Sequence, residues 1–166
     1  MPASSAPLAK TTVADWANLH AINATGAFLC TRAALPRLNE HGRIVTVASV
    51  SGRVGSKYTA AYTASKHAAV GLMRAAAAEV AGTRVRVNAV CPTFVATEMT
   101  QRSVAGIMRA TGRDEASSEA ALTSASPLGR LLDPQEVAAC VFWLASPDAA
   151  SINGQTVVLD GGGIQS

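Results

Sequence analysis

Short apolar runs alternate along the chain with longer stretches in which apolar residues recur at helical spacing. Three runs rich in β-branched residues, at 43–48, 85–90 and 155–159, are bounded by glycine, proline or polar residues, which predicts strands buried in a sheet. Helical stretches separate these strands along the chain, and such an order is typical of parallel strands joined by helical crossovers. The pattern therefore predicts an α/β fold whose parallel sheet has about three strands with flanking helices.

Four stretches carry the helical pattern. A long helix is predicted over 12–38, because it begins with the capping sequence Thr-Val-Ala-Asp, and Pro36 should kink it or stop it early. The alanine-rich stretch 59–81 predicts a second long helix. The polar stretch 96–127 indicates two short helices, and a final helix is expected over 134–145 because proline is favoured in a first helical turn.

The composition limits the class of protein. A chain of 166 residues is long enough for one domain with a sizeable core, and a composition of 49% hydrophobic and 15% charged residues argues against disorder. The net charge of +3 is spread along the chain, so neither a nucleic acid nor a membrane surface is expected as a partner. The N-terminal residues lack the pattern of a signal peptide, and no apolar run reaches membrane-spanning length. A cytoplasmic protein is therefore expected.

The cysteines give no sign of a disulfide framework or a metal site. Cys30, Cys91 and Cys140 lie far apart, each within an apolar run, and no cysteine and histidine cluster has ligand spacing. We expect all three to be buried as small hydrophobic side chains in a reducing compartment.

Candidate chemistry centres on the helix predicted over 59–81. Tyr62 and Lys66 lie four residues apart and so share one helix face, with Cβ atoms about 5–6 Å apart. An ammonium group there should lower the tyrosine pKa from about 10, and such a tyrosine can exchange a proton with an alcohol or ketone oxygen. Ser49 ends a predicted strand, at the edge where α/β sheets bind ligands. Taken singly, the tyrosine–lysine spacing often arises by chance, and the serine fits an ordinary loop.

Five motifs that occur in one order along the chain favour a catalytic role for these residues over a chance occurrence. They are Asn23-Ala-Thr-Gly26, Arg43-Ile-Val-Thr-Val-Ala-Ser49-Val-Ser-Gly52, Tyr62-Thr-Ala-Ser-Lys66, Val87-Asn88-Ala-Val-Cys-Pro92 and Asp160-Gly161-Gly162. Together they closely resemble the short-chain dehydrogenase/reductase (SDR) family over essentially the whole chain. The resemblance implies the C-terminal half of a doubly wound, Rossmann-like domain. It also implies reversible hydride transfer between NAD or NADP and a secondary alcohol or ketone, with a 3-oxoacyl thioester as one candidate substrate.

The resemblance implies roles for individual side chains. Tyr62 would be the general acid/base, and Lys66 would lower its pKa and bind the nicotinamide ribose, so both would also contact the cofactor. Ser49, preferred to Ser51 by its spacing to the tyrosine, would orient the substrate oxygen. Asn23 would hold a proton-relay water, although an asparagine that marks a helix kink is an alternative.

Further cofactor contacts are implied after the second strand. Pro92, the backbone near Val95 and the hydroxyl of Thr97 match the family's contacts to the nicotinamide carboxamide, and the stretch 99–128 would form a substrate lid. One position departs from the family, since Thr93 stands where a glycine usually follows the proline. Glycine permits close backbone approach and unusual dihedral angles, so this departure puts the fit of the nicotinamide in question.

A glycine-rich turn between a strand and a helix, which cradles the pyrophosphate in dinucleotide-binding folds, is not found in the chain. The glycines at 161–163 follow the last strand and no helix comes after them. The resemblance places that turn, with the family's first four strands, before Met1. A truncated gene product, a start codon assigned too late or a fragment would each explain this, and residues 1–166 are expected to form a single truncated domain.

Two functions remain open at this point. The first is an NAD(P)-dependent enzyme acting on a small alcohol or ketone, with a dimer or tetramer of identical subunits expected. The second is an inactive fragment that acts only in assembly with related subunits, through the helices around Asn23 and Tyr62. Gly71 and the Ala77–Ala78 pair would let neighbouring helices approach closely.

Overall fold

The computed structural model describes residues 5–124 and 126–165 and contains one parallel sheet. Its strands are β1 (Arg43–Val47), β2 (Arg86–Pro92) and β3 (Thr156–Leu159). They lie in the order β1-β2-β3, and both neighbouring pairs are parallel. The predicted three-stranded parallel sheet is therefore confirmed, with strand ends shifted by one or two residues. Residues 1–4, which contributed to the signal-peptide expectation, lie outside the described residues.

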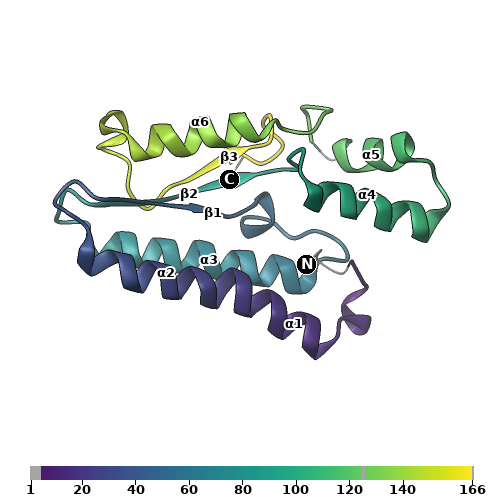
Figure 1. The fold of residues 1–166 in the computed structure, drawn as a ribbon, viewed down its shortest axis with the longest axis horizontal. Coiled ribbons are helices and arrows are strands. Elements are labelled where there is room, and N and C mark those ends of the chain that lie inside the picture. Colours follow the sequence, from purple (N-terminus) through teal and green to yellow (C-terminus); the bar gives the residue numbers. More distant parts are fainter. Residues whose placement is uncertain (1–4, 125, 166) are drawn as a thin grey trace.

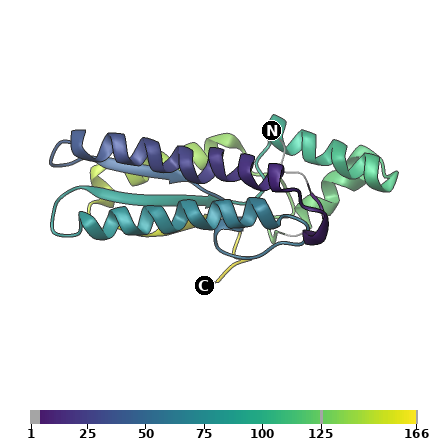
Figure 2. The same cartoon turned by 90° about the horizontal axis from the view of Figure 1, so that it is seen from below.

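Helices cover both faces of the sheet (Figure 1). They are α1 (Val13–His20), α2 (Gly26–Ala34), α3 (Ala60–Glu79), α4 (Glu98–Thr111), α5 (Glu115–Thr123) and α6 (Pro134–Ala145). Helices α1 and α2 follow one another and lie beside α3 on one face (Figure 2), whereas α6 covers the other face. Helices α4 and α5 extend beyond the end of the sheet. None of these helices is both long and apolar enough to cross a membrane.

Side chains that point alternately to the two faces of β2 divide the hydrophobic core into two clusters. Val87, Ala89 and Cys91 face α3 and pack with Met73, all at most 1% exposed. Val90 faces the other way and packs with residues of α6. Because side chains point alternately to opposite faces of a strand, a short apolar run supplies both clusters. This arrangement holds β2 at the centre of the sheet, with its carboxyl end at the edge where the candidate site lies.

The long helix predicted over 12–38 is interrupted. Thr12 caps its start as predicted, because the hydroxyl accepts a 3.0 Å hydrogen bond from the backbone N–H of Asp15. Between α1 and α2 the residues Ala21–Thr25 form a π-helical turn. Pro36 lies in a short 3-10 turn that follows α2, so the helix stops early, as expected for proline.

The expectation that all three cysteines are buried is wrong for one of them. Cys91 is fully buried, Cys140 is half-buried and Cys30 is exposed. Cys30 lies on α2, whose outer face carries several exposed apolar side chains, so an apolar neighbourhood in sequence did not imply burial.

Candidate active site

Three sequence-predicted residues come together at the carboxyl edge of the sheet. Ser49 follows β1 directly, while Tyr62 and Lys66 lie in the first two turns of α3, which begins at the same end of the sheet. The side chains of Tyr62 and Ser49 are close enough to interact, and this interaction favours the charged form of Tyr62. Lys66 Nζ lies 5.7 Å from the centroid of the Tyr62 ring. A phenol, a hydroxyl and an ammonium group therefore share one small region.

Local backbone geometry fixes Ser49. Its backbone is extended, and Ser49 caps the start of the 3-10 turn Val50–Gly52. Its hydroxyl accepts a 3.1 Å hydrogen bond from the N–H of Ser51, within that turn. Ser49 is 8% exposed. Of the two candidate serines, Ser49 contacts the tyrosine, whereas Ser51 contributes its backbone N–H to hold Ser49 in place.

The turn after Ser49 rests directly on the helix that carries Lys66. A Cβ atom added to Gly52 would lie 3.0 Å from the carbonyl oxygen of Lys66 and 3.0 Å from Cγ2 of Val70. Such a contact is tight, so a larger residue would push the turn away from α3. Gly52 thus sets the distance between the Ser49 turn and Lys66, although the sequence motif gave no reason for this glycine.

The pKa of Tyr62 shifts in the direction opposite to the expectation. Burial raises the pKa of Tyr62 above its ordinary value, and the hydrogen bond with Ser49 opposes that rise. Lys66 is not among the causes of this shift, and its Nζ donates to the carbonyl oxygen of Val47, 3.4 Å away. Burial lowers the pKa of Lys66 itself, and the neighbouring Cys91 thiol opposes this shift. Tyr62 therefore keeps its proton at neutral pH in this form of the protein.

Asn23 lies in the π-helical turn and reaches α3 through a residue that was not predicted. Its Nδ2 donates a 3.0 Å hydrogen bond to Oγ of Ser65, which in turn donates a 2.8 Å hydrogen bond to the carbonyl oxygen of Tyr62. Single turns of π-helix are often found at functional sites. The helix irregularity considered for Asn23 is thus present. The only sequence signal for Ser65 was its position three residues after Tyr62, on the same helix.

The segment after β2 carries the predicted cofactor contacts. Pro92 ends β2 and is buried, and Val95 bridges to Leu132, whose N–H and carbonyl pair with the segment at Phe94 and Ala96. The contact with Leu132 joins residues far apart in the chain, and no local sequence pattern predicts it. It fixes the backbone at which the nicotinamide contacts were expected.

Thr97 begins α4 without capping it. Its hydroxyl donates a 3.3 Å hydrogen bond to the carbonyl of Val95 and accepts none from the first turn of the helix. The first backbone N–H groups of a helix have no partner within the helix. The side chain of Thr97 does not satisfy them.

Thr93 does not strain the backbone where the family usually has glycine. Among the described residues, Tyr58 is the only non-glycine residue with a positive φ, of 65°. Thr93 therefore adopts a conformation open to any residue, and its N–H donates a 3.0 Å hydrogen bond to the carbonyl of Leu159. The departure from glycine adds a side chain here without distorting the chain.

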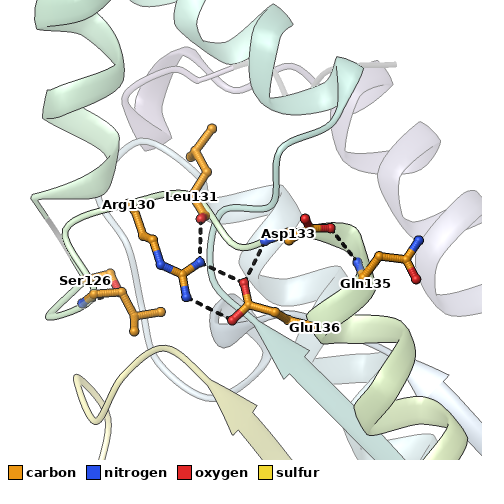
Figure 3. A network of polar contacts seen from close by, with 7 residues as sticks. Ser126, Arg130, Leu131, Asp133, Gln135 and Glu136 are labelled. Carbon is orange, nitrogen blue, oxygen red and sulfur yellow. Dashed lines mark hydrogen bonds and ion pairs between the residues drawn. The ribbon is translucent and has the colours of Figure 1, made fainter.

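A polar network holds the turn that carries Leu132 (Figure 3). The guanidinium of Arg130 donates two hydrogen bonds, of 2.7 and 2.9 Å, to the carboxylate of Glu136. Glu136 also accepts from the N–H of Asp133, whose own carboxylate caps α6. The hydrogen bonds from Arg130 lower the pKa of Glu136 to about 2. The turn that braces Val95 is therefore tied to the start of α6 by a charged group that stays ionised at neutral pH.

A parallel sheet covered by helices on both faces, with polar groups gathered at its carboxyl edge, defines the dinucleotide-binding class of α/β proteins. A family model described as enoyl-(acyl carrier protein) reductase matches residues 1–163. The chain belongs to the short-chain dehydrogenase/reductase family.

Curated relatives and solved structures agree with this family. Over 158 residues, which cover 95% of the chain, it is 40% identical to meso-2,3-butanediol dehydrogenase of Serratia marcescens. Over 151 residues, covering 89% of the chain, it is 40% identical to a putative ketoacyl reductase of the monensin polyketide synthase of Streptomyces virginiae. A variant of the actinorhodin polyketide ketoreductase, solved with NADPH, matches 98% of the chain with a TM-score of 0.88 and 33% identity.

The chain spans only part of the length of these proteins. It covers 59% of the butanediol dehydrogenase, 58% of the ketoacyl reductase and 63% of the solved ketoreductase chain.

Proposed function

We propose that the chain is the catalytic part of a dinucleotide-binding domain that reduces a ketone or oxidises a secondary alcohol with NAD(P)(H). One observation carries the proposal, namely the proximity of the Tyr62 and Ser49 side chains at the carboxyl edge of β1, with Lys66 Nζ 5.7 Å from the tyrosine ring. The names of the relatives support a carbonyl or alcohol substrate, since they include a diol dehydrogenase and ketoacyl reductases.

Each of the three side chains has a task in the transfer of the proton. In the direction of reduction, the Tyr62 hydroxyl donates its proton to the carbonyl oxygen, and the raised pKa of Tyr62 keeps that proton available at neutral pH. The Ser49 hydroxyl donates a second hydrogen bond to the same oxygen and so orients it. The Lys66 ammonium stabilises the phenolate that remains on Tyr62. A bound nicotinamide supplies the hydride.

The groups at the site fit a nicotinamide cofactor. An ammonium group has three donors, and among the described residues Lys66 uses one, in the 3.4 Å hydrogen bond to Val47. A cofactor hydroxyl such as that of the ribose would use another. The uncapped start of α4 offers N–H donors to the carboxamide, beside the braced backbone of Val95 and Pro92, and the hydroxyl of Thr97 would join them by giving up its hydrogen bond to the carbonyl of Val95. The solved relative with NADPH supports a nicotinamide dinucleotide as the cofactor, and these residues do not select between NAD and NADP.

Helices α4 and α5 are proposed as the substrate lid, because they extend beyond the carboxyl edge of the sheet (Figure 1). Met99, in the first turn of α4, is 56% exposed and available to an apolar substrate, whereas Val104 is 5% exposed and belongs to the packing of the helix. A hollow of about 550 Å³ lies farther along, lined by α5 residues with Gly129 and Arg130. Because its lining includes neither Ser49 nor Tyr62, we do not assign it to the reacting carbonyl.

Substitution of the two neighbouring serines tests the site. Ser49→Ala should lower kcat for ketone reduction by the intact protein roughly 10²–10³-fold, as expected when a donor to a developing oxyanion is lost. Cofactor affinity should change little. Ser51→Ala is the matched control, because it removes a similarly buried hydroxyl from the same turn but keeps the backbone N–H bonded to Ser49. NADPH consumption with a panel of ketones measures both. Equal losses in the two variants would contradict the assignment of Ser49.

Specific surface features favour a second candidate, assembly with further subunits. Gly71 and Ala78 are exposed on α3, and Ile22 is 59% exposed on the neighbouring helix. Ala77, which was expected to join this surface, is instead 2% exposed and packs in the core. In addition, β1 has one pairing partner among the described strands, and Val47 at its end is 51% exposed. We propose a homo-oligomer, with catalysis as the primary function.

A further inference from the structure

Beneath the candidate catalytic tyrosine, one buried serine joins two helices. We propose that Ser65 is a positioning residue, which fixes the side-chain orientation of Asn23 and the backbone of Tyr62 at the same time. This inference deepens the proposed function and rests on it, since Tyr62 is the proton donor there.

The number of donors and acceptors on the Ser65 hydroxyl determines which way the Asn23 amide points. Ser65 is fully buried, and its hydroxyl has one proton, which it donates to the carbonyl oxygen of Tyr62 at 2.8 Å. Toward Asn23 the hydroxyl oxygen can therefore only accept. It does so from Nδ2 at 3.0 Å. The amide oxygen of Asn23 is consequently turned away from Ser65, so Ser65 decides the orientation of an amide that could otherwise flip.

The same bond supports an unfavourable backbone. Asn23 lies at the middle of the π-helical turn Ala21–Thr25, where the N–H of Gly26 donates to the carbonyl five residues back, at Ala21. A π-helical turn is rare and persists where the surroundings hold it. The Asn23–Ser65 bond links this turn to α3 over 42 residues of sequence. Loss of the Ser65 hydroxyl removes that link and leaves a half-buried amide donor without its acceptor.

On the Tyr62 side, Ser65 acts through the backbone. A serine that donates to a carbonyl in the preceding helical turn bends the helix slightly. Here that carbonyl belongs to Tyr62 itself, close to the start of α3. The bond therefore influences the position from which the phenol reaches Ser49. Displacement of a reacting group by about 1 Å can cost about 100-fold in rate.

The test combines spectroscopy with kinetics on Ser65→Ala in the intact protein. In ¹⁵N–¹H spectra the Asn23 side-chain amide, assigned by its disappearance in Asn23→Ala, should shift and exchange faster with solvent. In ketone reduction, kcat should fall roughly 10- to 100-fold while KM for the ketone changes little. Ser146→Ala is the matched control, because Ser146 also donates a 2.8 Å hydrogen bond to the carbonyl oxygen three residues back, at Trp143, but it follows the end of α6 and lies outside the proposed site and lid. This control should leave both readouts unchanged.

The outcomes separate this inference from the proposed function. An unchanged Asn23 signal in Ser65→Ala would overturn the inference, as would a shifted signal with unchanged kcat. An inactive wild-type protein would count against the proposed function and so against the catalytic part of the inference. In that case the amide signal would still report whether Ser65 holds Asn23. If Ser65→Ala does not fold, Asn23→Asp removes the amide donor from a half-buried position. A kcat equal to that of the wild type in Asn23→Asp would then overturn the inference.

Discussion

Replacement of Tyr62 with phenylalanine should lower the turnover of ketone reduction by roughly 10²–10⁴-fold, the range expected when a general acid is removed. The substitution deletes only the phenolic hydroxyl, which is the proposed proton donor and the partner of Ser49. The aromatic ring remains, so the contact with Lys66, whose Nζ lies 5.7 Å from the ring centroid, is preserved. Affinity for NADH and NADPH should therefore change little. Steady-state kinetics and fluorescence titration measure the two quantities.

The second tyrosine of the chain provides the control for this substitution. Tyr58 precedes α3 and is 59% exposed, so Tyr58→Phe removes a phenolic hydroxyl close by in sequence without touching the Ser49 hydrogen bond. Turnover in Tyr58→Phe should stay within a fewfold of the wild type. Near-normal turnover of Tyr62→Phe at every pH would show that the proton comes from another group.

Lys66→Ala should weaken both catalysis and cofactor binding, because one ammonium group serves the phenolate and the cofactor. Loss of a charged hydrogen bond of about 1.5–3 kcal/mol corresponds to roughly 10- to 100-fold in affinity for NADH or NADPH. Turnover should fall further, since the phenolate left after proton transfer loses its counter-charge. Equilibrium fluorescence titration with each dinucleotide, beside steady-state kinetics, separates the two losses.

Two further variants serve as controls for the two tasks assigned to Lys66. Lys57→Ala removes an exposed lysine from the loop before α3 and should leave both quantities unchanged. Ser49→Ala should reduce turnover but not dinucleotide affinity. If Ser49→Ala and Lys66→Ala lost the same cofactor affinity, the division of tasks between the two side chains would be wrong.

The sheet was predictable because its signals are local. The β-branched runs at 43–48 and 85–90 are short and bounded by glycine or proline, so they fit buried strands and little else. The start of the first helix was equally clear, since the threonine cap depends on residues three positions apart. Ser49, Tyr62 and Lys66 were identified by spacing and resemblance, and parallel strands then bring them to one edge.

Features that depend on tertiary contacts were not predictable. The π-helical turn is held by the bond from Asn23 to Ser65, two residues far apart in sequence, and no local periodicity reports it. The direction of the Tyr62 pKa shift depends on burial, which the spacing of Tyr62 to Lys66 does not report. The brace from Leu132 to Val95 joins two irregular segments and is likewise invisible in the sequence.

Isotope transfer tests the central claim most directly. The intact protein is incubated with a ketone and with NADPH, or NADH, deuterated at the nicotinamide carbon that donates the hydride, and the alcohol is analysed by mass spectrometry. Our account predicts one deuterium on the carbinol carbon of the product, formed by the wild type and reduced at least about 100-fold in rate in Tyr62→Phe. Alcohol without deuterium, or deuterated alcohol formed equally fast by Tyr62→Phe, would contradict it.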